Sequence, residues 1–400
     1  MSAGASALLS AQAVRSHCAQ IMALAEQDRA PHFCWHPQQL PAAAAYVADT
    51  IRQRYPDLQV PYHSRWRHFE AGGVDRWGML ARRHALEGAE RARTRIDLVI
   101  PSVLLDAGAG PDWQYRDDAT AMRLSRSEGL GVASLALFAG GALSDDAARP
   151  LRADAAALRR LPESALAQVF QAGAANPLVG LEGRAALMQR LGEAVAAAPD
   201  IFGTPGRLGN LYDSLAARAD NGRIGAGAVL QVLLRTLGPV WPGRIALDGV
   251  ALGDCWRHPG TDDGLVPFHK LTQWLTYSLL EPLEEAGLAV SGLDQLTGLP
   301  EYRNGGLLLD LGVITPRDPS FLSRLLKVDE PAVVEWRALT VIALDRLADA
   351  VRAELGVDAG AFPLARVLEG GTWAAGRRIA AERRPGGAPP VSIASDGTVF

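Results

Sequence analysis

The clearest structural signal in the chain is residues 331–351, PAVVEWRALTVIALDRLADAV. Its apolar side chains recur at helical spacing and cover most of the circumference: Val333, Val334, Trp336, Leu339, Val341, Ile342, Leu344, Leu347 and Val351. We expect Asp329 to be the N-cap, with Pro331 in the first turn. A helix that is apolar nearly all round lies at the centre of a bundle, so this stretch predicts a mainly α-helical protein.

The same helical period continues through most of the chain. Helices are expected at residues 11–27, 42–54, 76–106, 130–143, 163–171, 181–198, 207–219, 226–237, 267–281, 307–313 and 331–351. Pro101 predicts a kink or a boundary within the third of these. Strand signals are few: Asp248-Gly249 predicts a small type I′ hairpin, and Asp396-Gly397 a second one within residues 391–400.

Residues 144–162 are rich in Ala, Asp and Arg, which indicates a connection between two parts of the chain. We therefore expect an N-terminal helical region at residues 1–143 and a second helical region at residues 144–400. The chain of 400 residues is long enough for one large core, so the two regions are expected to form one intimate unit.

Charge and composition exclude several classes of protein. There are 40 Lys and Arg against 44 Asp and Glu, and 48% of residues are hydrophobic, which excludes a disordered chain. The near-neutral balance is evenly spread, so the basic stripe of a nucleic-acid-binding protein is missing. Only Lys270 and Lys327 are lysines, and nearly all other cations are Arg.

The cysteines and apolar stretches indicate a cytoplasmic protein. Cys18, Cys34 and Cys255 form no CxxC motif and no even disulfide framework, which suits a reducing compartment. The start of the chain lacks the pattern of a signal peptide. Residues 130–143 are too short to cross a bilayer and are expected to be a core helix. Residues 107–110 lack the full GxGxxG spacing, so no cofactor is predicted.

A metal site is one alternative at residues 32–36, HFCWH. In an extended segment His32, Cys34 and His36 point to one side and could supply two imidazoles and a thiolate. The alternative is a packed turn rich in aromatic residues, because prolines bracket the segment and no second ligand pair follows.

Residues 62–68, YHSRWRH, gather cations and aromatics. Strand alternation would place His63, Arg65 and Arg67 on one face, where they could hold a phosphate or a polyhydroxyl ligand. An exposed strand paired with acidic neighbours is the other interpretation.

Residues 267–281 predict a helix with an apolar back and a polar, aromatic front. His269, Gln273 and Thr276 share one stripe, while Lys270, Trp274 and Tyr277 lie beside it and leucines lie opposite. Such a front is typical of a half-buried pocket for a small polar ligand. A core helix with satisfied polar groups is the alternative.

Residues 296–306, LTGLPEYRNGG, form a turn that delivers Glu301, Tyr302 and Arg303 just ahead of an apolar helix. A partly desolvated carboxylate at this place could be a general base or could stabilise positive charge. It could equally be a helix cap paired with a nearby Arg.

Five stretches resemble the uracil-catabolism protein family of fungi and bacteria. They are LLDAGAGPDW (104–113), SRSEG (125–129), NPLVGLEGR (176–184), VPFHK continuing to Tyr277 (266–277) and LTGLPEYRNGG (296–306). The resemblance covers nearly the whole chain. It implies a role in uracil degradation through ribosylated intermediates, including a ribosyl-urea, with urea as a product.

A second, more distant similarity is to the queuosine nucleoside hydrolases, relatives of helix-hairpin-helix DNA glycosylases. Residues 269–273, HKLTQ, are similar to their Tyr-Lys-Arg-Ala-Gln segment, and residues 296–303 to their Leu-Thr-x-Phe-x-Asp-Tyr-Arg segment. Glu301 then stands where those proteins carry the Asp taken as catalytic, and residues 335–337 match a later helix. This similarity implies a glycosylase-like multi-helix bundle with one or two small β-hairpins.

Together the resemblances imply a metal-independent N-glycosyl hydrolase that cleaves a ribosyl-urea or its phosphate to urea and ribose or ribose phosphate. Cleavage passes through an oxocarbenium-like state, which Glu301 would stabilise. The proton donor stays open among Asp112, His269 and a water held by Gln273.

The resemblances also imply the binding groups. Trp113 and Tyr302 would cover the urea-like group, while Lys270 and Arg303, with Arg65 or Arg67, would contact ribose hydroxyls or a phosphate. Tyr277 would line the same pocket. The expected partner is thus a small molecule, not nucleic acid or a membrane. The rival functions are a metal-dependent amidohydrolase using His32, Cys34 and His36, and a non-catalytic binding protein.

Overall fold

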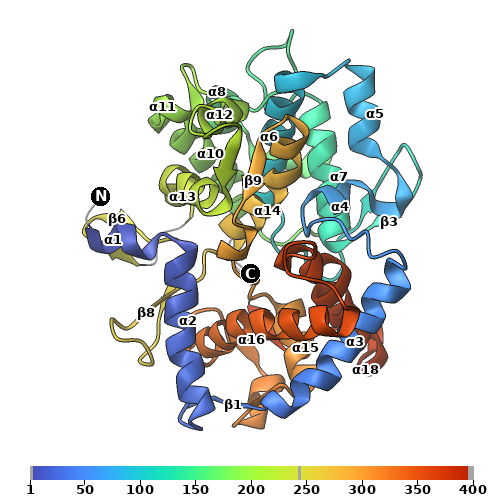
Figure 1. Cartoon of the computed structure of the whole chain (residues 1–400). Helices are drawn as coiled ribbons and strands as arrows, with labels where there is room; N and C mark the ends of the chain where they lie inside the picture. The colour runs from blue at the N-terminus through green and yellow to red at the C-terminus, as the bar shows by residue number, and fades with distance from the viewer. Residues whose placement is uncertain (1–2, 242–244, 395–400) are drawn as a thin grey trace.

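The protein is described by a computed structural model that covers residues 3–241 and 245–394. It is mainly α-helical, as predicted, and the apolar stretch forms the long helix α16 (Pro331–Leu355) in the lower half of Figure 1. The helix begins one residue later than expected, since Glu330 and not Asp329 is its N-cap. The Glu330 side chain accepts a hydrogen bond from the backbone N–H of Lys327 and does not cap α16.

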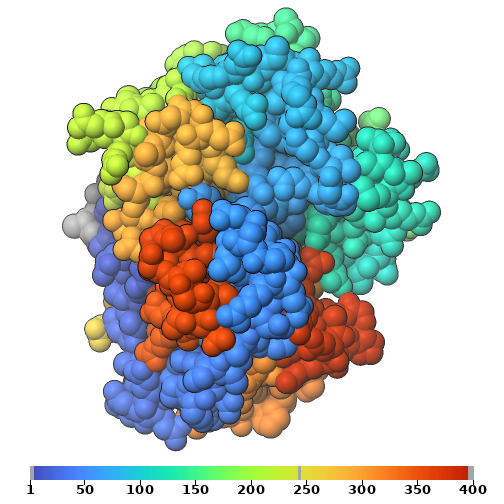
Figure 2. Space-filling model, turned by 45° about the vertical axis from the view of Figure 1, so that its right-hand side comes forward, coloured from blue at the N-terminus to red at the C-terminus, as the bar shows by residue number. Residues whose placement is uncertain are grey.

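Helices from both ends of the chain surround α16. The N-terminal helices α2 (Ala11–Glu26) and α3 (Leu40–Arg54) pack on it, and so does α15 (Tyr302–Asp310). α18 (Trp373–Arg383) packs on α15, and in Figure 2 N-terminal atoms in blue lie beside C-terminal atoms in orange and red. Gly305 lets α15 approach closely, because an added Cβ there would lie 2.5 Å from the Trp336 ring.

A second group of helices occupies the upper half of Figure 1. α6 (Gly88–Leu104) packs against α14 (Lys270–Glu285) and α7 (Arg126–Ala139). The remaining helices of this group are α4 (Trp66–Phe69), α5 (Arg76–Arg83), α8 (Ala155–Arg160), α9 (Glu163–Val169), α10 (Leu181–Ala197), α11 (Pro199–Phe202), α12 (Leu211–Ala216) and α13 (Ala226–Leu237). Short α1 (Ala3–Leu8) precedes α2, and α17 (Leu364–Arg366) leads into a π-helical turn, η7 (Val367–Thr372).

The predicted long helix at residues 76–106 is two helices, α5 and α6. The break lies between them, where Ala85 and Gly88 both have positive φ, and not at Pro101. Pro101 sits in the last turn of α6, where its missing N–H and ring do not end the helix. Pro282 is likewise tolerated, since α14 continues to Glu285.

The strands of the described residues are short and form two-stranded pairs only. β5 (Ala246–Leu247) and β6 (Val250–Ala251) form the predicted hairpin, with positive φ at Asp248 and Gly249. Near the end of the described residues, β12 (Ser392–Ala394) pairs in parallel with β11 (Leu325–Lys327), and the expected C-terminal hairpin stays a prediction. Its proposed turn, Asp396-Gly397, lies outside the described residues.

Of the four other pairs among the described residues, two join segments far apart in sequence and two join neighbouring segments. They are β1 (Phe33–Trp35) with β10 (Ile314–Pro316), β2 (Tyr115–Arg116) with β3 (Arg123–Leu124), β4 (Arg223–Gly225) with β9 (Ala289–Ser291), and β7 (Cys255–Arg257) with β8 (Leu265–Pro267). One large hydrophobic core extends from Leu9 to Val391, on both sides of residue 143. The expected boundary between two helical regions at residue 143 stays a prediction.

None of the helices in the described part of the chain combines the length and hydrophobicity that a membrane span requires. The apolar residues 130–143 are mostly in α7, whose side chains from Gly129 to Phe138 are largely buried in the core. This agrees with the expected core helix.

Candidate active site

A cavity of about 480 Å³ lies where the two groups of helices meet. Its walls come from the segment before α4, the loop after α6, and the first turns of α7, α14 and α15, with Trp373 and the C-terminal segment completing them. The polar and aromatic lining residues are His63, His68, Asp106, Arg126, Ser127, Lys270, Trp274, Glu301, Tyr302, Arg303, Trp373 and Ser392. This size and mixture suit a small polar ligand.

Glu301 lies in the cavity wall and is also the N-cap of α15. Its Oε1 accepts the Asn304 backbone N–H at 2.6 Å, and its Oε2 accepts that of Arg303 at 2.7 Å. Burial raises the pKa of the Glu301 carboxyl, although these N–H groups and the charge of Lys270 act to lower it. Glu301 is therefore a helix cap, and capping holds its buried carboxylate at the cavity wall. Its role as a base or as a stabiliser of positive charge stays a prediction.

Lys270 brings a second charge to the same wall from the first turn of α14. Burial lowers the pKa of its ammonium, while the charge of Glu301 opposes this effect. The Lys270 backbone N–H donates to Asp254 Oδ2 at 3.0 Å, so the start of α14 is anchored.

Asp254 and Arg337 form a buried ion pair that joins both sides of this wall. Two bonds of 2.9 Å connect the guanidinium and the carboxylate, and Arg337 Nε donates to the Pro300 carbonyl at 3.3 Å. The pair thus links the Lys270 end of α14 to the residue that precedes Glu301. Because Arg337 faces it, Asp254 keeps its carboxyl pKa far below the usual range despite burial.

Asp106 lies in the cavity wall just after α6. Its Oδ1 accepts a bond of 2.6 Å from Arg65 Nη1, and its Oδ2 accepts one of 3.1 Å from the Ser127 hydroxyl. Burial raises the pKa of the Asp106 carboxyl, opposed by the charge of Arg65. Arg65 is fully buried behind Asp106, so its role is to position and neutralise this carboxylate.

Two histidines in the cavity wall, His63 and His68, use the same ring nitrogen in opposite ways: Nδ1 donates in one and accepts in the other. His63 donates from Nδ1 to Glu369 Oε2 at 2.8 Å, which leaves its Nε2 outside that bond. His68 accepts at Nδ1 from Arg65 Nη1 at 3.3 Å, so its Nε2 carries the hydrogen. Trp274 and Trp373 flank both rings, at centroid distances from 5.7 to 6.2 Å.

We expect His68 to remain neutral at a pH at which an ordinary histidine binds a proton. Burial lowers the pKa of this ring well below 6.5, and the charge of Arg65 adds to the shift. Unfolding exposes an ordinary His that binds a proton, so His68 stabilises the fold above the unfolded pKa, and this contribution falls as pH decreases below it. NMR titration of the ring protons, assigned with His68→Gln, measures this; a His68 midpoint near 6.5 in the folded protein would contradict it.

Two residues predicted from the 104–113 motif are not in the cavity. Asp112 is exposed in a turn, and Trp113 is fully buried, with its indole N–H donating to the Phe170 carbonyl at 3.0 Å. The carboxylate of this motif that reaches the cavity is Asp106. Both acids follow α6, but the chain turns at Gly110, where φ is +89°, and carries the later acid outward.

Only part of the predicted polar and aromatic front of α14 faces the cavity. Lys270 and Trp274 line the cavity, whereas His269, Gln273 and Tyr277 are buried elsewhere. His269 Nε2 bonds to the Leu8 carbonyl at 2.9 Å.

Gln273 and Tyr277 bind the loop that carries Glu301. The Thr297 backbone N–H donates to Gln273 Oε1 at 2.8 Å, and the Tyr277 hydroxyl donates to the Thr297 carbonyl at 3.1 Å. These two residues therefore position the site instead of touching its ligand.

The predicted alternation at residues 62–68 is wrong because this segment is not a strand. Turn bonds from Arg67 and His68 to preceding carbonyls lead into the helical turn α4, so the period of two is lost. His63 and His68 consequently face the same cavity, while Arg67 points away and pairs with Glu281 at 2.8 Å.

Trp274 was predicted on the front of the pocket helix and His63 on a candidate ligand-binding face. Asp106, His68, Arg126 and Trp373 were not predicted as lining residues, nor was Glu369 behind them. His63 and His68 were visible in the cationic cluster, but the wrong period assigned them to opposite faces. Glu369 lies in the π-helical turn η7, a kind of distortion often found at functional sites, yet it has no local signal in the sequence.

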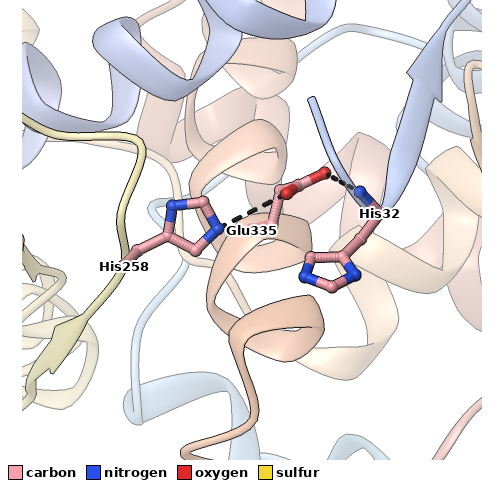
Figure 3. A group of neighbouring side chains, drawn as sticks. All are labelled: His32, His258 and Glu335. Atoms are coloured by element: carbon pink, nitrogen blue, oxygen red, sulfur yellow. Dashed lines mark hydrogen bonds and ion pairs between the residues drawn. The ribbon is translucent and has the colours of Figure 1, made fainter. Parts of the chain in front are cut away.

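His32, Cys34 and His36 do not gather into a metal site. His36 Nε2 contacts Thr315 Oγ1 at 2.8 Å instead. Among the described residues, the group with potential ligand atoms within 4.8 Å of one another is His32, His258 and Glu335 (Figure 3).

Hydrogen bonding at this trio does not fit a metal. The Gly260 backbone N–H donates to His258 Nδ1 at 3.0 Å, so the proton of the neutral ring lies on Nε2. That nitrogen faces Glu335 Oε2 at 3.4 Å, and Glu335 Oε1 accepts the backbone N–H groups of His32 and Phe33. A metal would need the Nε2 lone pair. The trio therefore ties two loops to α16, and we assign it no metal.

Comparison with known proteins places the chain in a family. Protein urg3 of Schizosaccharomyces pombe is 39% identical over 402 residues, with 98% of each chain covered. Uracil catabolism protein 4 of Lachancea kluyveri is 38% identical over 431 residues, again with 98% of each covered. Residues 7–400 match the family model described as "Protein of unknown function (DUF1688)". The chain belongs to this family.

Proposed function

We propose that this protein hydrolyses an N-ribosidic bond in uracil catabolism and converts a ribosyl-urea, or its phosphate, to urea and ribose or ribose phosphate. The observation that carries the proposal is the buried carboxylate of Glu301, held by two backbone N–H groups at the cavity wall beside Lys270. A relative that matches this chain over nearly its whole length is named for uracil catabolism, which supports the pathway.

In the proposed reaction the C1–N bond breaks and its electron pair leaves on nitrogen. Glu301 stabilises the positive charge on the sugar and takes a proton from the water that bonds to C1. Its raised pKa suits a group that must accept a proton. The departing nitrogen needs one proton to leave as neutral urea.

We assign the proton donor to His63. Its Nδ1–H is held by Glu369, so a protonated Nε2 can donate toward the cavity. The predicted donors Asp112 and His269 do not line the cavity, and neither does Gln273, which would have held a water. Neutral His68 supplies a hydrogen-bond donor, and Trp274 and Trp373 supply apolar walls.

The proposal extends to a glycosylase-like bundle related to helix-hairpin-helix proteins. Its support is the similarity at residues 269–273 and 296–303, together with the bond from Arg337 to the Pro300 carbonyl beside Glu301. The mechanism proposed for the cavity needs no metal.

Incubation with ribosyl-urea, its 5′-phosphate, uridine and queuosine tests the function, with release of urea or free base as the measurement. We expect urea from a ribosyl-urea substrate and no loss of rate with a chelator. Absence of urea from both ribosyl-urea forms would overturn the proposal. Stoichiometric zinc with chelator-sensitive turnover would overturn the metal-free mechanism and favour an amidohydrolase.

A further inference from the structure

The cavity contains two arginines, Arg126 and Arg303, that the proposed hydrolysis does not use. Arg126 comes from the first turn of α7 and Arg303 from the first turn of α15. They donate to neighbouring carbonyls: Arg126 Nη2 to Gly386 at 3.3 Å and Arg303 Nη1 to Gly387 at 3.1 Å. Both glycines have positive φ, near 65°, so this turn holds the two guanidinium groups at one side of the cavity.

Neither arginine has a carboxylate within ion-pair distance among residues 3–241 and 245–394. Arg303 is nevertheless only 6% exposed. Burial lowers the pKa of its guanidinium; Tyr302 and Glu301 oppose this shift, and the nearby charges of Arg126 and Arg377 add to it. Arg377 itself is paired with Glu128, so it does not supply a free charge.

The balance of charge in the cavity favours an anion. Lys270, Arg126 and Arg303 are the cations that line it, and Asp106 and Glu301 are the carboxylates. Asp106 is already paired with Arg65 behind the wall. Among the described lining residues, three cations therefore face Glu301 alone and two positive charges remain unmatched, in a chain whose formal net charge is −4.

We propose that Arg126 and Arg303 form a subsite for a phosphate monoester, so that the substrate is a sugar phosphate and not a free nucleoside. Two unmatched charges suit a dianion better than a single carboxylate, and guanidinium forks match phosphate oxygens in pairs. Glu301 is the N-cap of α15 and Arg303 lies in the first turn of the same helix, which places the anion subsite next to the carboxylate that would act on the sugar. This inference rests on the proposed function for the sugar but not for binding of the anion.

Calorimetric titration of the full chain with ribose 5-phosphate, ribose, inorganic phosphate and 3-ureidopropionate tests the subsite. We expect ribose 5-phosphate to bind at least about 10-fold more tightly than ribose, because it adds charge-assisted hydrogen bonds. Inorganic phosphate is expected to compete with it. Equal binding of ribose and ribose 5-phosphate would overturn the proposal, as would tighter binding of the carboxylate 3-ureidopropionate.

Three variants locate the effect. Arg303→Met and Arg126→Met are each expected to weaken ribose 5-phosphate binding about 10- to 100-fold and to leave ribose binding nearly unchanged. Arg123→Met, at an exposed position of β3 outside the cavity, is the matched control and should bind normally. If Arg303→Met does not fold, the Arg126→Met variant still tests the proposal, because Arg126 is exposed and its replacement should not disturb the fold. Normal binding of ribose 5-phosphate by Arg126→Met would overturn the subsite.

The binding measurement separates this proposal from the hydrolytic one. Tight binding of ribose 5-phosphate without urea release from any ribosyl-urea would leave the subsite standing and remove the proposed reaction. Urea release from free ribosyl-urea as fast as from its phosphate would leave the proposed reaction standing and remove the phosphate subsite.

Discussion

Replacing Glu301 with glutamine is expected to reduce urea release by about 1,000-fold or more, since the variant can neither carry negative charge nor accept a proton from water. The side chain keeps its size, so the cavity keeps its shape. Glutamine can accept only through one oxygen, whereas Glu301 accepts the N–H groups of Arg303 and Asn304 through both. A modest destabilisation of about 1–2 kcal/mol is therefore expected as well. Single-turnover rates at saturating substrate, with a thermal melt of the same sample, measure both effects.

Glu330→Gln is the matched control for Glu301→Gln. Glu330 is also the N-cap residue of a helix, but it lies outside the cavity and pairs with Arg324. This control should lose little stability and no activity. A folded Glu301→Gln protein that turns over near the normal rate would show that another group performs the chemistry.

Replacing Asp254 with asparagine is expected to destabilise the fold by about 3–5 kcal/mol, because it removes the negative charge that faces buried Arg337. The Asp254 oxygens also accept the Trp256 indole N–H and the Lys270 backbone N–H, and an amide NH₂ cannot accept either. Because Arg337 lowers the pKa of Asp254, this contribution is present above the unfolded pKa near 4 and is lost as pH falls further. Urea unfolding at pH 7 measures the change.

The same substitution in an exposed ion pair provides the comparison. Asp145 pairs with Arg160, and both side chains are largely in solvent. Asp145→Asn should therefore cost less than about 1 kcal/mol. Equal losses of stability in the Asp254 and Asp145 variants would contradict the anchoring role of the Asp254–Arg337 pair.

Sequence periodicity predicted the helices well because their buried faces are continuous. It located α16, α2 and α13 to within a few residues, since their apolar side chains repeat every three to four positions. It placed the break of residues 76–106 wrongly, because positive φ at Ala85 has no distinct sequence signal while Pro101 has a strong one. The pairing of β12 with β11 joins distant segments and no local pattern indicates it.

The candidate site was predictable where one motif carried it. Glu301, Tyr302 and Arg303 come from a single turn, and Lys270 starts a recognisable helix. Which of the two acids, Asp106 or Asp112, reaches the cavity depends on the path of the chain at Gly110, which the sequence does not specify. The contact between His63 and Glu369 depended on two segments meeting across the fold, which side-chain spacing alone does not specify.

The pairing of β12 with β11 also bears on when the cavity can exist during synthesis. Val391, Ser392 and Ile393 form part of its wall, opposite a segment that begins at His63. A ribosome must therefore release nearly the whole chain before the wall can close. Until then the half-built cavity has only its earlier residues. Before α16 emerges, the apolar faces of α2 and α3 that pack on it are exposed, a condition under which large domains depend on protection from aggregation.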